Sequence, residues 1–107
     1  MDLRTAILTL LDAGVGFGVE VLSDLSIFQE DNHFVVQAYE PLDDDGTSLN
    51  GYYTSTRLGT LLERKKPEHD WLYREFSTAV EAVDYFLALR VEARQGLDFP
   101  ENELTGV

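Results

Sequence analysis

The sequence of 107 residues contains no cysteine, which excludes disulfide bonds and thiolate metal sites. It has no run approaching the ~18 apolar residues that a membrane-spanning helix needs. The N-terminal segment lacks the basic leader of a secretory signal peptide, and threonine interrupts its apolar run. Because these absences are compatible with a reducing compartment, we expect a cytoplasmic protein.

Positive charge is also scarce. The chain has 8 Lys and Arg residues against 20 Asp and Glu residues, which gives a net charge of −12. Residues 1–56 hold ten of the acids and a single base, Arg4. Direct binding to nucleic acid or to an anionic membrane is therefore disfavoured, because both require a basic patch. A basic protein surface is the partner that this charge favours.

The acidity is densest in residues 20–46, which contain no Lys or Arg. The eight carboxylates of this stretch are Glu20, Asp24, Glu30, Asp31, Glu40, Asp43, Asp44 and Asp45. Shortly after it come Tyr52 and Tyr53, and strand alternation would direct one of the two rings outward. Tyrosine is enriched at binding hot spots. These ten residues are the candidate partner-binding residues of the chain.

The hydrophobic pattern predicts one acidic α+β domain over residues 1–96 and a poorly ordered tail over residues 97–107. The predicted antiparallel sheet has about four strands, over residues 17–22, 25–30, 33–40 and 51–57, with 71–76 as a candidate further strand. Helices over residues 2–12 and 78–94 are expected to pack on one face of this sheet. Both faces of the 33–40 strand are partly apolar, which favours a central position for it.

Local signals define the helices more closely. Asp2 is a candidate N-cap of the first helix, and Gly14 is a natural left-handed residue after its end. Thr78 and Glu81 have the spacing of a capping box. The apolar line predicted for the last helix is Val80, Val83, Leu87 and Val91, widened by Ala79, Ala82, Phe86 and Leu89. Residues 58–66 favour a two-turn helix stopped by Pro67, with a strand extension as the alternative.

No motif in the chain supports catalysis or a cofactor. The Asp43-Asp44-Asp45-Gly46 run lacks the ligand spacing of a calcium loop, because its glycine comes fourth and Thr54 stands at position twelve. His33 and His69 have no metal-binding spacing. The glycines at positions 14, 16 and 18 follow a predicted helix, whereas a phosphate loop follows a strand. We therefore expect no cofactor, no metal and no enzymatic activity.

These observations favour a small acidic inhibitor or immunity-type protein. It would engage a basic surface of a nucleic-acid-handling protein or a toxin, partly by imitating phosphate charge. A phage anti-defence protein, such as a CRISPR or restriction inhibitor, or a toxin antidote has this size and charge. The alternative is a non-catalytic accessory or regulatory subunit, built as a homodimer through a sheet edge or an aromatic patch. A small enzyme or ligand-binding module is the third hypothesis.

Overall fold

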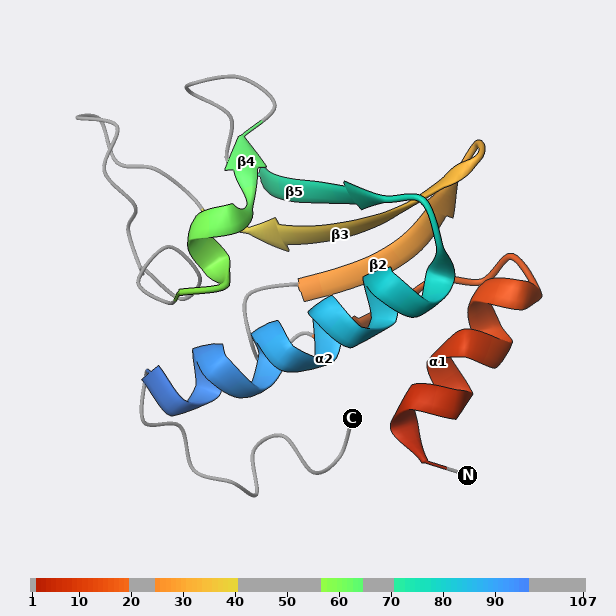
Figure 1. The fold of residues 1–107 in the computed structure, drawn as a ribbon, viewed down its shortest axis with the longest axis horizontal. Coiled ribbons are helices and arrows are strands. Elements are labelled where there is room, and N and C mark those ends of the chain that lie inside the picture. The colour runs from red at the N-terminus through yellow and green to blue at the C-terminus, as the bar shows by residue number, and fades with distance from the viewer. Residues whose placement is uncertain (1, 20–24, 41–56, 65–70, 97–107) are drawn as a thin grey trace.

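In a computed structural model, two helices pack against one face of a five-stranded antiparallel sheet (Figure 1). The structure describes residues 2–19, 25–40, 57–64 and 71–96. In chain order the elements are α1 (Leu3–Asp12), β1 (Phe17–Val19), β2 (Leu25–Glu30), β3 (His33–Tyr39), the 3₁₀ turn η2 (Gly59–Leu61), β4 (Glu63–Arg64), β5 (Trp71–Phe76) and α2 (Ala79–Gly96). The predicted α+β class is confirmed.

The strands lie in the order β1-β2-β3-β5-β4, and each neighbouring pair is antiparallel. The predicted central position of β3 is confirmed, because β2 and β5 pair with its two edges. The strand predicted over 51–57 falls outside the described residues except for Arg57, which lies in a turn. The predicted tail over 97–107 lies outside them as well.

Helix α1 has hydrogen-bonded caps at both ends. The Asp2 carboxylate accepts a 2.7 Å hydrogen bond from the Thr5 backbone N–H, and this bond lowers the pKa of Asp2. At the other end, the N–H of Val15 donates to the carbonyl of Leu10 at 2.8 Å, while Gly14 has a φ of 78°. This Schellman arrangement requires a left-handed residue, which glycine adopts without strain. Both predicted ends of the helix are therefore confirmed.

The hairpin between β2 and β3 turns through Asp31 and Asn32. Glu30 pairs with His33 across the turn, and Asp31 takes a left-handed φ of 53°. Aspartate is one of the few residues that tolerate this conformation, because its short polar side chain bonds locally. The turn thereby sets a register in which Ile27 of β2 lies opposite Val36 of β3, and both residues belong to the core.

The predicted capping box of α2 is present, with one difference in its geometry. The N–H of Glu81 donates to the Thr78 hydroxyl at 3.2 Å. The Glu81 carboxylate accepts from the Thr78 hydroxyl at 2.8 Å, in place of the backbone N–H of Thr78. The hydroxyl therefore serves as acceptor and donor together, and it fixes the start of the helix.

Replacing Thr78 with alanine should lower the free energy of unfolding by about 1 kcal/mol, because a backbone N–H of the first turn loses its acceptor. Urea unfolding followed by circular dichroism measures the change. Thr78→Ser keeps the hydroxyl and should lose much less stability. An equal loss in the two variants would show that the methyl group, not the cap, is responsible.

The core lies between the sheet and the two helices. Its fully buried residues include Ile7 and Leu11 from α1, and Leu25, Ile27, Val36, Ala38 and Leu72 from the sheet. Helix α2 contributes Ala82, Val83, Phe86 and Leu89. The rings of Phe17 and Phe86 meet edge to face with centroids 5.9 Å apart. Phe86 therefore links β1 to the middle of α2.

The apolar line predicted for α2 is wrong in its orientation. Val80 and Val91 are 47% and 48% exposed, whereas Val83 is buried. The buried stripe is centred on Ala82, Phe86 and Leu89. Because the helix carries apolar residues around much of its circumference, its periodicity alone does not select the face that packs on the sheet.

The two-turn helix predicted over residues 58–66 is also wrong. The chain makes one 3₁₀ turn at Gly59–Leu61 and then enters the two-residue strand β4. Glu63 and Arg64 pair with Tyr73 and Leu72 of β5. A strand this short exists only through its partner, so its own residues carry almost no strand signal.

Candidate protein-binding surface

Three of the ten candidate partner-binding residues are described: Glu30, Asp31 and Glu40. The others, Glu20, Asp24, Asp43, Asp44, Asp45, Tyr52 and Tyr53, lie outside the described residues. Glu30 and Asp31 are exposed at the tip of the β2–β3 hairpin. Glu40 differs from the expected surface position, since it is fully buried and its backbone carbonyl accepts a 3.1 Å hydrogen bond from Arg64.

The hairpin end of the sheet is acidic. Glu75 on β5 pairs with Val35 in register, which places its side chain on the same face as His33 and Glu30. The Glu75 carboxylate lies 3.4 Å from Nε2 of His33, and its side chain is 55% exposed. Glu30, Asp31 and Glu75 therefore form a group of exposed acids with His33 beside them. The sequence pattern did not associate Glu75 with this group, because strand pairing brings it there.

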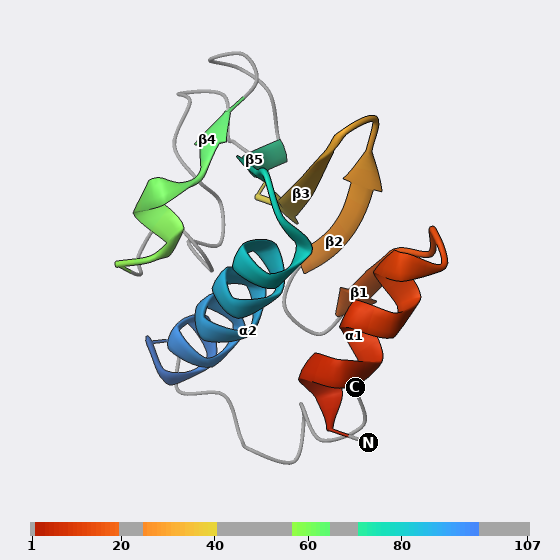
Figure 2. The same cartoon turned by 45° about the vertical axis from the view of Figure 1, so that its right-hand side comes forward.

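The sheet has a second face, turned away from both helices. Helices α1 and α2 lie on the same side of the sheet in both views (Figures 1 and 2). Since alternate residues of a strand point to opposite faces, the residues between the core positions point away from the helices. They are Ser26, Phe28 and Glu30 on β2, His33, Val35, Gln37 and Tyr39 on β3, and Trp71, Tyr73 and Glu75 on β5. We call this set the outer face.

Aromatic side chains occupy one end of the outer face. Tyr39 pairs with Trp71 in register, and their rings meet at a centroid distance of 4.9 Å. Tyr73 follows on β5, and all three side chains are half-buried. Tyr and Trp offer a large apolar contact area at low cost in side-chain entropy. An aromatic area beside exposed acids is typical of a protein-binding surface with a polar rim.

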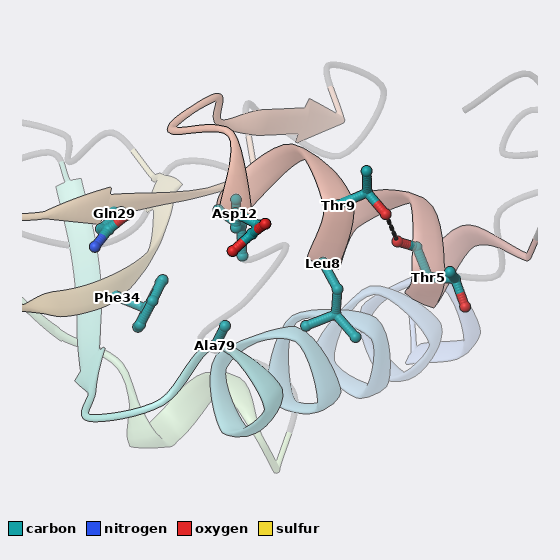
Figure 3. Close-up of a pocket in the computed structure, with 8 residues that line it drawn as sticks. Thr5, Leu8, Thr9, Asp12, Gln29, Phe34 and Ala79 are labelled. Carbon is teal, nitrogen blue, oxygen red and sulfur yellow. Dashed lines mark hydrogen bonds between the residues drawn. The ribbon is translucent and has the colours of Figure 1, made fainter.

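An open groove lies on the helix side, between α1, the hairpin and the start of α2 (Figure 3). It encloses about 610 Å³ and is lined by Thr5, Leu8, Thr9, Leu11, Asp12, Gln29, Phe34 and Ala79. The Thr9 hydroxyl donates to the Thr5 carbonyl at 2.8 Å, so it is engaged within its own helix. Among the described residues of this lining, Asp12 is the one ionisable side chain. A general acid and base pair needs two such groups within reach of a substrate.

A second groove runs along the side of β5 that is turned away from β3. It has a volume of about 500 Å³ and is lined by Thr60, Leu61, Glu63, Tyr73, Arg74 and Glu75. The guanidinium of Arg74 is turned toward the helix side, where it lies 5.3 Å from the ring centre of Phe76 and 5.2 Å from that of Tyr85. Its charge is thus held against two rings. Glu63 and Glu75 are the exposed charges of the groove.

Two further results concern the described residues as a whole. No three His, Asp or Glu side chains among them gather closely enough to hold a metal ion. None of their helices is long and apolar enough to cross a membrane.

Comparison with known proteins identifies no relative of this chain. No protein-family model, curated protein or solved structure matches this chain.

Proposed function

We propose that this chain is a small acidic protein-binding inhibitor or immunity-type protein. It engages a basic surface of a nucleic-acid-handling protein or a toxin, in the manner of a phage anti-defence protein or a toxin antidote. The observation that carries the proposal is the outer face, where an aromatic area adjoins exposed acids in a chain of net charge −12. Such a field accelerates encounter with basic partners and repels acidic ones.

Charge and aromatic contact have separate roles in this proposal. The exposed acids supply long-range attraction. At an ionic strength of 0.15 M this attraction is screened beyond about 8 Å. Tyr39, Trp71 and Tyr73 supply the short-range contact that is desolvated on binding. We place this activity in the cytoplasm, where nucleic-acid-handling proteins of a host cell are found.

A non-catalytic subunit that forms a homodimer is the second candidate, and the aromatic end of the outer face favours it. Two copies could bury Tyr39 and Trp71 against each other. Salt separates the two proposals. A homodimer held by apolar contact should persist or strengthen as salt rises, because the repulsion between two acidic copies is screened. Binding to a basic partner should weaken.

The acidic run supplies a direct test. Replacing Asp43, Asp44 and Asp45 with asparagine should weaken capture of basic partners by about threefold to a hundredfold, since each ion pair with the partner contributes about 0.2–1 kcal/mol. Stability should change little, because the proposed ion pairs form with the partner and not within the chain. Quantitative pull-down from host extract at low and high salt, with the bound proteins identified, measures the effect.

The matched control removes three acids elsewhere, as Asp98→Asn, Glu101→Gln and Glu103→Gln. The two variants have the same net charge, so they differ only in where the charge was removed. An equal loss of binding would point to net charge and not to the acidic run. Capture that is independent of salt in the wild-type protein would overturn charge mimicry itself.

A further inference from the structure

Strand β5 is paired along its whole length on one side and only at its beginning on the other. Along one edge, β3 pairs with it from Trp71 to Phe76. Along the opposite edge, β4 pairs only with Leu72 and Tyr73. Among the described residues, no strand lies beside residues 74–76 on that side. Alternate residues of an antiparallel strand direct both backbone groups to the same neighbour. In the part of the chain that the structure describes, no backbone hydrogen bond meets the groups that residues 74–76 direct to this side.

In the described part of the chain, β4 does not extend beside residues 74–76, because the chain before β4 turns away from β5. Leu62 would stand opposite Arg74 if β4 continued, but its N–H donates to the Gly59 carbonyl at 3.1 Å and so closes the 3₁₀ turn. Helix α2 holds this turn in place. The Leu58 N–H donates to the Glu92 carboxylate at 2.6 Å, and the Tyr85 hydroxyl donates to the Leu58 carbonyl at 2.6 Å.

The groove beside β5 therefore occupies the space that a continuing strand would fill. It extends from the 3₁₀ turn to Glu75, and Leu61, which is 48% exposed, lines it. We propose that this edge of β5 is a docking site for an extended, basic segment of a partner protein, which pairs with residues 74–76 as an added strand. This inference rests on the proposed function and names the part of the partner that is bound.

Charge complementarity argues for a basic segment. A residue placed directly opposite Glu75 in an added strand would have its side chain about 5 Å away, on the outer face. Glu63 lies further along the same groove and is also exposed. Lys or Arg at alternate positions of the segment would meet these carboxylates. The residues between them would point to the helix side, where Phe76 and the ring-stacked Arg74 favour apolar side chains.

The same charges argue against a second copy of this chain at the edge. Each copy has a net charge of −12. Pairing two β5 edges would bring Glu63 and Glu75 of one copy toward the same residues of the other. Like charges placed opposite one another in a sheet are destabilising.

The test uses the full chain and a peptide of about six residues with alternating lysine and valine, blocked at both ends, which matches a usual strand length. The control peptide has the same sequence with alternate backbone nitrogens methylated. It keeps every charge and side chain but cannot pair along one edge. Backbone amide shifts and hydrogen exchange, measured by NMR, report binding and its place.

We expect the unmodified peptide to bind about tenfold more tightly than the methylated one and to protect amides within residues 74–76 from exchange. Glu75→Lys should weaken binding of the unmodified peptide. Asp12→Lys makes an equal charge change at an exposed residue of α1 and should leave that binding unchanged. Equal binding of both peptides would overturn the edge site and leave the proposed function standing, because charge attraction alone would then explain it.

Two other results would also overturn the edge site. Concentration-dependent protection of residues 74–76 without any peptide would show that a second copy occupies the edge. Shifts confined to the hairpin around Glu30 and Asp31 would move peptide binding elsewhere on the acidic surface. The acidic-run variant tests the proposed function separately, since none of its three substitutions is in β5 or β4.

Discussion

Replacing Phe86 with alanine is expected to lower the free energy of unfolding by about 3–5 kcal/mol, the range for large aromatic residues removed from a core. Phe86 is fully buried and packs edge to face on Phe17. Its ring lies between α2 and the sheet, so no solvent-exposed group can collapse easily into the cavity. A domain of this size has about 5–15 kcal/mol of stability in total, and this variant should lose a large part of it.

Urea unfolding measures this loss, with Val91→Ala as the matched control on the same helix. Val91 is 48% exposed, and its truncation should cost less than about 0.5 kcal/mol. If Phe86→Ala does not fold, Phe86→Leu provides a graded change with an intermediate loss. A loss in Phe86→Leu no greater than that in Val91→Ala would contradict the packing described for α2.

The ends of the helices and the β2–β3 hairpin were predictable from sequence, because short-range chemistry determines them. Asp2, Gly14 and Thr78 each act through backbone groups within a few residues, so their roles do not depend on the rest of the fold. The same is true of Asp31, whose left-handed conformation is a local preference. The partly apolar character of both faces of β3 then indicated its central position.

The features that were not predicted depend on contacts between distant segments. The buried face of α2 is selected by its fit to the sheet, and Val80 and Val91 are apolar without being part of it. Strand β4 exists because β5 is beside it. Glu40 is buried although acidic residues usually remain at the surface, and its neighbourhood includes Arg64, which is distant in sequence.

The candidate surface likewise combines features that local sequence predicts with features that depend on contacts between distant segments. Charge identified Glu30 and Asp31 as exposed acids, because a two-residue turn must lie at the surface. It did not identify Glu75, which the β3–β5 register places opposite Val35, or the contact of Tyr39 with Trp71 that the same register creates. Register between strands that are far apart in sequence is set by the whole sheet, and no local pattern contains it. The short pairing of β4 with β5, which leaves residues 74–76 without a described strand on that side, could not be predicted for the same reason.

The hydrogen bond from the Tyr85 hydroxyl to the Leu58 carbonyl leads to a second large effect on stability, and this effect depends on pH. Burial raises the pKa of Tyr85 from 10.0 to about 12, while nearby Arg74 lowers it. Between pH 10 and about 12 the unfolded chain loses the phenol proton and the folded protein retains it. The contribution of Tyr85 to stability is therefore complete below pH 10 and is lost as the pH rises toward 12.

A shift of one pKa unit corresponds to about 1.4 kcal/mol, and because the Tyr85 side chain is partly exposed we expect a smaller total of about 1–2 kcal/mol. Tyr85→Phe should abolish this part of the decline in urea unfolding measured from pH 8 to pH 12. At pH 8 the variant should already be about 1 kcal/mol less stable, because the Leu58 carbonyl loses its 2.6 Å donor.

Phe86→Leu is the matched control, since it is also destabilised but retains the phenol. It should keep the wild-type decline above pH 10, so that low stability itself is not mistaken for the effect. The difference between Tyr85→Phe and wild type should therefore shrink as the pH rises. A difference that stays constant to pH 12 would mean that the Tyr85 hydroxyl titrates equally in the folded and unfolded chains, and that the 3₁₀ turn is not anchored through it.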